Sequence, residues 1–264
     1  MESLSVFYIV KDEEKRLAES LEKAVQVADE IIVLDSGSTD RTIEIAESFG
    51  AKVFFKEWQG FAKQKADASE LCKNKWLLNL DADEILSDEL IENIKKTLKR
   101  EDLSEYAGFM INWRYVPPVS GHPLRYIPDN FYFRFYHKDK VVFVTESNSN
   151  DDRPSISNGK EGKLSGNMLH KAVINFDQLE KKYSLLTSDQ AKYFFDSERK
   201  ISNLRLYLEF PLKFLKYFFV VGLCRNGWYG FSLSIVAAYR NFMRFAKARE
   251  LQINHLLENK IKKD

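Results

Sequence analysis

Short apolar runs and helical segments alternate four times in the first hundred residues, and this alternation constrains the fold more than any other feature. β-Branched and aromatic residues, typical of strands buried on both faces, fill the runs "LSVFYIV", "EIIVLD", "KVFFK" and "KWLLNLD". The first helical segment has apolar residues at helical spacing, namely Leu17, Leu21, Ala24 and Ala28. The pattern predicts a doubly wound, mostly parallel α/β sheet.

Polar residues and glycine predict where some of these helices begin and end. We expect the second helix to be capped at Ser38 or Thr39 and to stop at Gly50. Ser87 is expected to cap a helix whose first turn is acidic. The apolar stripe of that helix consists of Leu90, Ile91, Ile94 and Leu98.

The alternation of predicted strands and helices ends after residue 105. Longer strands are predicted in "YAGFMINWRYV" and "NFYFRFYHKDKVVFV", with a turn at "HKDK". The stretch 145–167 is polar and rich in glycine and serine, so we expect a loop there. From about residue 176 the chain is predicted to be helical and increasingly aromatic.

The formal net charge of +1 conceals a strong asymmetry. Between Arg199 and Arg249, ten basic residues accompany one acid, Glu209, so this segment carries +9 and the rest of the chain −8. Such a split predicts an anionic surface or ligand on one side of the protein.

The cysteine content and the hydropathy of the chain indicate the cellular compartment in which the protein is expected. Cys72 and Cys224 are the only cysteines and lie far apart, which favours a reducing compartment without a disulfide framework. The start "MESLSVFYIVKDEE" has an acid where a signal peptide has basic residues, and no window of about 20 residues is apolar enough to span a bilayer. We therefore expect the chain to remain in the cytoplasm.

Acids follow two of the predicted strands. Asp35 ends one strand, and Asp81, Asp83 and Glu84 follow another, at the sheet edge where ligands of open α/β sheets bind. Asp81 and Asp83, two residues apart, suit one hard divalent ion. The alternatives are an Asx-turn or helix cap at Asp35, and a strand stop with helix-cap acids at 81–84.

Three segments in the stretch 31–90 carry a specific resemblance. The sequences "VLDSGSTDRTIEIAESFGAKV", "EWQGFAKQKADAS" and "KWLLNLDADEILSDEL" resemble family 2 glycosyltransferases of the GT-A fold, within the bacterial lipopolysaccharide-core glucosyltransferase branch. The resemblance implies a catalytic domain over 1–175, divided near residue 104 into nucleotide-sugar and acceptor halves. A helical, basic and aromatic extension would occupy 176–264.

The resemblance also implies a donor and its ligands. The donor would be UDP-glucose or another UDP-hexose, with Asp35 on the uridine and Asp81 on the ribose or diphosphate. Asp83, together with Asp81, would hold Mg²⁺ or Mn²⁺ against the diphosphate. Lys65 would face the nucleotide; the alternative is an ordinary solvated helix lysine.

The family inverts the anomeric centre, so a carboxylate must take the proton of the acceptor hydroxyl. The resemblance points to Glu146 as this base, with Asp129 and Asp151 as competitors. The alternative reading of Glu146 is a solvated acid in a loop.

Two further residues stand out in the second half of the predicted domain. Arg134 is expected either to meet an acceptor phosphate or to pair with an acid. His170 resembles a position that the family often fills with histidine, although a lone histidine is more often structural. Without cysteine or histidine neighbours it predicts no zinc site.

The C-terminal region has 14 uncharged residues, 226–239, flanked by basic residues. They suit either the interface of an anionic membrane or a helical hairpin packed on the catalytic domain. The resemblance implies a UDP-sugar and a glycan or glycolipid acceptor as partners, and the basic flanks add peripheral contact with the cytoplasmic face of the inner membrane. No nucleic acid is expected, and the sequence leaves the oligomeric state open.

Rival functions remain at this stage. A nucleotidyltransferase normally has a glycine-rich basic loop near the first strand, and "VFYIVKDEE" contains no glycine. A phosphatase with an Asp-x-Asp nucleophile needs threonine or valine shortly after the second Asp, unlike "DADEIL". From another class, a catalytically inactive nucleotide-sugar-binding protein or membrane scaffold of the same fold would share the site but never turn over.

Overall fold

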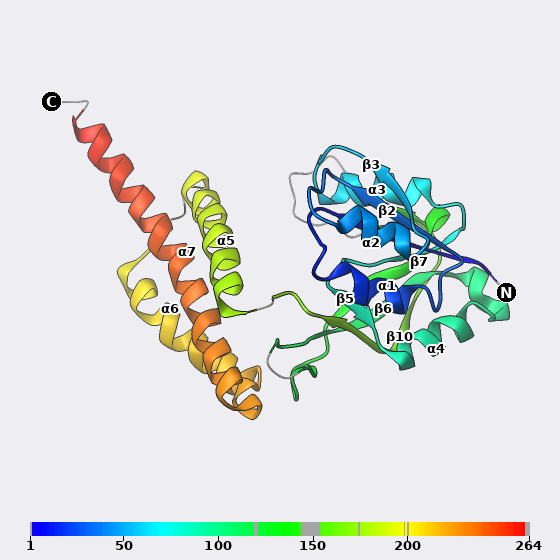
Figure 1. The fold of residues 1–264 in the computed structure, drawn as a ribbon. Helices are drawn as coiled ribbons and strands as arrows, with labels where there is room; N and C mark the ends of the chain where they lie inside the picture. Colours follow the sequence, from blue (N-terminus) through cyan, green and yellow to red (C-terminus); the bar gives the residue numbers. More distant parts are fainter. Residues whose placement is uncertain are drawn as a thin grey trace. The chain divides into compact units, whose positions relative to one another are not determined.

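A computed structural model of the protein describes residues 2–118, 121–143, 154–173, 175–197, 199 and 201–261 (Figure 1). The chain divides into two compact units. The first comprises Met1–Val116 and Asp129–Ala172, and the second Pro117–Pro128 and Val173–Asp264.

The first unit is built on an eight-stranded sheet in the order β3-β2-β1-β4-β7-β6-β10-β5. Its strands are β1 (Leu4–Val10), β2 (Glu30–Asp35), β3 (Lys52–Phe55), β4 (Trp76–Asn79), β5 (Glu84–Leu86), β6 (Tyr106–Tyr115), β7 (Phe131–His137) and β10 (Lys160–His170). The pairs β3/β2, β2/β1, β1/β4 and β6/β10 are parallel, whereas β7 and β5 run antiparallel to their neighbours. The predicted mostly parallel α/β sheet is confirmed.

Helices cover both faces of this sheet (Figure 1). They are α1 (Leu17–Ala24), α2 (Thr42–Ser48), α3 (Phe61–Leu71) and α4 (Asp88–Thr97). Successive residues of β1 enter different cores: Tyr8 packs with Leu17 and Leu21 of α1, and Phe7 with Ala68 of α3. Burial on both faces explains why the strands read as continuous apolar runs. As predicted, Ser87 caps α4, and its hydroxyl accepts a hydrogen bond from the Leu90 N–H.

The predicted loop at 145–167 is wrong over its second part. Residues 145–153 of this stretch lie outside the described residues. Four short elements complete the first unit, namely η1 (Glu101–Glu105), η2 (Lys138–Lys140), β8 (Val141–Val142) and β9 (Ser155–Ile156), the last of which falls inside the predicted loop. From Lys160 the chain is then the inner strand β10. A Cβ at Gly162 would lie 2.4 Å from the Phe109 ring, and one at Gly166 would lie 2.5 Å from the Leu90 nitrogen. The glycines therefore mark close packing against neighbouring elements, which sequence alone does not distinguish from a loop.

The second unit is helical. It contains α5 (Phe176–Asp196), α6 (Asn203–Leu215), the π-helical η3 (Lys216–Val220), η4 (Leu223–Asn226) and α7 (Gly227–Ile261). Both α5 and α6 pack along α7 (Figure 1). Gly230 lets η4 lie close to the start of α7, because a Cβ there would lie 2.0 Å from the Leu223 carbonyl oxygen. Within the described part of the chain, no helix is both long and apolar enough to cross a membrane.

Candidate functional site

The carboxyl edge of the parallel strands gathers the polar residues of the first unit. Asp35 ends β2, Asp81 and Asp83 follow β4, and His170 ends β10. Glu84 returns to the same edge because β5 is antiparallel to β10 and pairs Glu84 with His170. Parallel strand ends are where open α/β sheets bind ligands.

Asp35 is buried, and its carboxylate is engaged in the turn that follows it. It accepts hydrogen bonds from the N–H groups of Gly37 at 2.7 Å and Ser38 at 3.0 Å, and from the Ser38 hydroxyl. Gly37 has φ of +99°, which favours glycine at this position. The geometry is the Asx-turn given as one alternative for Asp35.

This turn also moves the start of α2. The Ser38 hydroxyl is used by Asp35, and the Thr39 N–H donates to Asp12 at 2.8 Å. The helix begins at Thr42, whose N–H donates to Asp40 at 3.0 Å. The predicted cap at Ser38 or Thr39 is therefore wrong, because those residues serve the sheet edge.

Asp81 lies between two cations. Its carboxylate is 2.7 Å from Arg134 Nη2 and 3.4 Å from Lys65 Nζ, and its side chain is 37% exposed. Lys65 is buried, so it is not a solvated helix lysine. Burial raises the pKa of Asp81, but the charges of Arg134 and Lys65 outweigh it and hold that pKa below its usual range.

Arg134 connects three residues at this edge. Besides Asp81, it donates to the Asn79 amide oxygen at 2.7 Å and to Glu84 at 2.8 Å. Of the two roles expected for Arg134, the structure shows pairing with acids. Glu84 is buried and also accepts the Asp81 N–H at 2.9 Å. Burial raises the pKa of Glu84 to about 8 despite Arg134, so Asp81 is the stronger acid of the two.

Asp83 faces a different pair of groups. Its Oδ2 lies 3.3 Å from His170 Nε2 and 3.4 Å from Arg16 Nη1, and Arg16 also pairs with Glu13 at 2.7 Å. The His170 ring packs on Trp113 with centroids 4.3 Å apart. Burial raises the pKa of Asp83, but the hydrogen bond and charge of His170, together with Arg16, bring it below its usual range.

The donor set at Asp83 is compatible with a divalent cation. Asp83 and His170 offer one oxygen and one nitrogen, and hard ions at nucleotide sites often take only one or two protein carboxylates. Within the described residues, no three His, Cys, Asp or Glu side chains gather closely enough to hold a metal by themselves. Mg²⁺ or Mn²⁺ would therefore need ligand oxygens here, and Asp81 faces Arg134 and Lys65 instead of sharing the partners of Asp83.

The base candidates fall in different places. Glu146 and its competitor Asp151 lie outside the described residues. Asp129 is described: its side chain is 60% exposed, 3.0 Å from the Asn112 amide nitrogen and 3.3 Å from Arg114.

Sequence reasoning missed the roles of Glu84 and Arg16. The acidic run "DADE" was a signal for Glu84, but nothing marked Arg16 among the charges of "KDEEKR".

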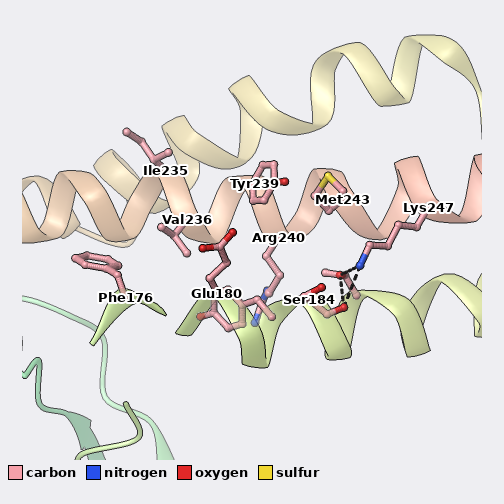
Figure 2. A pocket seen from close by; sticks show the side chains of 11 residues that line it. Phe176, Glu180, Ser184, Ile235, Val236, Tyr239, Arg240, Met243 and Lys247 are labelled. Carbon is pink, nitrogen blue, oxygen red and sulfur yellow. Dashed lines mark hydrogen bonds between the residues drawn. The ribbon is translucent and has the colours of Figure 1, made fainter. Parts of the chain in front are cut away.

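A separate cavity of about 290 Å³ lies between α5 and α7 in the second unit (Figure 2). Its lining is mostly apolar, and the two basic residues that line it, Arg240 and Lys247, interact with neighbouring side chains and backbone. Lys247 donates to the Ser184 carbonyl and the Thr187 hydroxyl at 3.0 and 2.9 Å, while Arg240 lies over the Tyr183 ring. Nothing in this cavity matches the paired acids and cations of the sheet edge.

Comparisons with known proteins show which family the chain belongs to. The sequence model described as "Glycosyl transferase family 2" matches residues 5–159. A glycosyltransferase of Rickettsia typhi is 35% identical over 96% of this chain and 89% of its own length. The lipopolysaccharide core biosynthesis glycosyltransferase LpsC of Rhizobium meliloti is 30% identical, over 92% and 91% respectively.

One solved structure supports the fold. The 1–349 fragment of TarS from S. aureus, in complex with UDP-GlcNAc, matches with a TM-score of 0.51 over 97% of this chain and 92% of that one. At 14% identity this likeness shows the fold alone. The family match, in contrast, covers more than half of the chain, and the relatives span nearly all of it. The chain belongs to glycosyl transferase family 2 and is a glycosyltransferase of the GT-A fold.

Proposed function

We propose that the protein transfers a hexose, with glucose as the first candidate, from a UDP-sugar to a lipopolysaccharide-core or other cell-envelope glycan. The observation that carries this proposal is the charged sheet edge, where Asp81 lies between Lys65 and Arg134 beside the Asp83–His170 pair. Cations suit a diphosphate, and carboxylates suit sugar hydroxyls or a metal. The named role of LpsC supports the acceptor class.

Each residue has a proposed part in donor binding. Asp35 binds the uridine from its place at the end of β2, and Asp81 binds the ribose or diphosphate. Lys65 and Arg134 offset the charge of the diphosphate, because they lie within 3.4 Å of Asp81 at the end of the strand. Asp83, with His170 beside it, holds Mg²⁺ or Mn²⁺, which when bound would neutralise charge on the leaving diphosphate.

The proposed reaction is a single displacement with inversion. The acceptor oxygen forms a bond to the anomeric carbon as the bond from that carbon to the diphosphate oxygen breaks, and UDP leaves with the electron pair. Glu146 takes the acceptor proton. Holding donor and acceptor in line would contribute a large part of the rate enhancement.

An acceptor of this class is anchored in a membrane. We therefore propose that the protein works in peripheral contact with anionic lipid at the cytoplasmic face of the inner membrane. The basic segment between Arg199 and Arg249 supports this contact through its charge of +9.

A donor and turnover screen tests the proposal. The full chain is mixed with Mn²⁺ and UDP-glucose, UDP-galactose or UDP-N-acetylglucosamine, and the melting temperature and UDP release with a deacylated core acceptor are measured. UDP-glucose should give the largest shift and sustained UDP release. Binding of UDP with metal but no turnover on any acceptor would favour the inactive binding protein, and no donor binding would overturn the proposal.

A further inference from the structure

Helix α6 turns its one acid, Glu209, inward against Arg244 of α7. Arg205, Glu209 and Lys213 are spaced four residues apart and therefore lie along one line of the helix. Glu209 is 8% exposed, and its carboxylate is 3.5 Å from Arg244 of α7, with Arg205 and Lys213 at 3.9 and 4.0 Å. In this cluster of one acid and three cations, the buried acid marks the side of α6 that packs on α7.

The opposite side of α6 is apolar and exposed. We call it the α6 face, and it consists of Leu204, Tyr207, Leu208, Pro211, Leu212 and Leu215. Leu204 is 67% exposed, Tyr207 76% and Leu212 58%. The spacing of three and four residues places these side chains on one side, and in α6, which the structure describes completely, no charged residue shares it.

Further exposed apolar residues follow α6 along the chain. Phe219 and Val220 of η3 are exposed, as is Trp228 at the start of α7. A surface helix of a globular protein normally has the reverse arrangement, with its apolar stripe buried and its charges in water. An exposed apolar helix face of this kind marks a surface that binds something.

The charge of the second unit identifies the partner. The one acid between Arg199 and Arg249 is Glu209, which is buried, so the exposed charges of α6 and η3 are the cations Arg205 and Lys216. The exposed Glu250 of α7 lines a cavity together with Tyr207, but Arg249 lines the same cavity. A second copy docking on the same face would bring two basic segments together, which repel. Anionic lipid headgroups attract them, while acyl chains accept the leucines.

We propose that the α6 face is the membrane-binding surface of the protein, lying in the plane of an anionic bilayer at the level of the headgroups. A helix of this length extends for about 20 Å, enough to lie on a bilayer but not to cross it. Tyr207 and Trp228 carry the amphipathic aromatic rings that favour this depth. The inference rests on the proposed function for its purpose, since the acceptor would be membrane-anchored.

Vesicle binding with a matched control tests the α6 face. Full-length protein is sedimented with phosphatidylcholine vesicles that contain about one third phosphatidylglycerol, and with vesicles of phosphatidylcholine alone. The wild type should bind the anionic vesicles, and the double variant Leu208→Asp/Leu212→Asp should lose at least about tenfold in partitioning. The control is Leu185→Asp/Leu186→Asp on α5, which adds the same charge at residues 71% and 38% exposed but off the face, and should stay within about twofold of wild type.

A second measurement uses the folded wild type. Lipids brominated along the acyl chain should quench the fluorescence contributed by Trp228, and Trp228→Phe should remove that part of the quenching. Equal binding by the face variant and wild type, or no binding of wild type to anionic vesicles, would overturn the inference. So would a dimer in lipid-free solution that the face variant dissociates, because the face would then serve a second copy.

The two proposals can fail separately. Transfer to a deacylated acceptor in solution needs no membrane, so the face variant should keep wild-type turnover in that assay. Vesicle binding without any turnover would remove the proposed function and leave the α6 face standing. Turnover with no vesicle binding would do the opposite.

Discussion

The sheet edge of the first unit and helix α6 of the second both bury charge, but to different ends. At the sheet edge, Asp81 pairs with Lys65 and Arg134 yet stays 37% exposed, so its carboxylate remains within reach of a ligand. In α6, Glu209 is buried against Arg244, and what faces water is a row of leucines. Buried charge is costly unless paired. Ion pairing can therefore accompany two different results: a carboxylate that stays accessible to a ligand, or a helix whose apolar side faces the solvent.

Removing Arg134 should have the largest effect, because both Asp81 and Glu84 pair with it. Arg134→Met would leave two acids without this cation, and breaking a buried pair on one side costs about 3–5 kcal/mol. We expect the free energy of unfolding, measured by urea denaturation, to fall by about that amount. Arg134→Lys should recover part of it by restoring the charge without the forked geometry.

The matched control for Arg134 is Arg100→Met. Arg100 also pairs with an acid, Asp102, but both side chains are at least 40% exposed. Such surface pairs contribute about 0–1 kcal/mol. Equal losses in the free energy of unfolding would show that the ion pairs of Arg134 contribute no more than an exposed surface pair.

Asp83→Asn should have the next largest effect, on activity rather than on stability. It removes the carboxylate proposed to hold Mg²⁺ or Mn²⁺, and a group that stabilises charge in the transition state is worth about 10²–10³ in rate. We expect sugar transfer to fall by that factor and the Mn²⁺-dependent thermal shift with UDP to disappear. Asp139→Asn, on an exposed aspartate that pairs with Lys75, should leave both unchanged.

The pH dependence of stability tests Glu84. Its pKa is raised to about 8 from an ordinary value of 4.5, so between these values the folded state binds a proton that the unfolded state does not. The stabilisation is complete below about pH 4.5 and is lost as the pH rises through 8, by at most about 1.4 kcal/mol per pH unit. Asp81 has the opposite effect on the pH dependence. Because its pKa is lowered in the folded state, the stability that it contributes is lost only as the solution becomes acidic.

Glu84→Gln separates these two contributions. Glutamine keeps an acceptor oxygen for the Asp81 N–H but does not titrate, so the fall in stability between pH 5 and 8 should be smaller in the variant. Urea unfolding at pH 5, 6, 7 and 8 measures the difference. Parallel curves for wild type and variant would mean that Glu84 titrates normally in the folded protein.

How far the sequence predicted the molecule also differs between the two regions. The sheet class and the cap at Ser87 followed from apolar periodicity and a polar residue before a helix, which are local signals. The strand over 160–167 was missed because its glycines meet Phe109 and Leu90, which are distant in sequence. Periodicity does not report contacts between remote segments.

The same limit applies to the candidate site. The acids at 35, 81 and 83 could be placed at one edge of the sheet from their positions after strands. Their partners could not, since Arg134 and His170 come from strands 50 or more residues later. In the second unit, the sequence alone showed that the helices are rich in basic and apolar residues. The inward direction of Glu209 depends on Arg244 of another helix.

The smallest effect is expected in the second unit, from Glu209→Gln. This change removes the negative charge that neutralises Arg244, but Arg205 and Lys213 are 55% and 30% exposed and can turn to water. The loss in the free energy of unfolding should therefore be about 1–2 kcal/mol, less than for Arg134. Urea denaturation measures both variants under the same conditions.

The orientation of α6 gives this last prediction a second readout. Without the carboxylate, nothing acidic on α6 draws its charged line toward α7, and the helix is freer to rotate its leucines inward and its cations outward. Glu209→Gln should then bind anionic vesicles more weakly than wild type, even though it adds no charge to the α6 face. Wild-type vesicle binding together with the stability loss would show that helix packing alone, and not the buried ion cluster, sets the direction of the face.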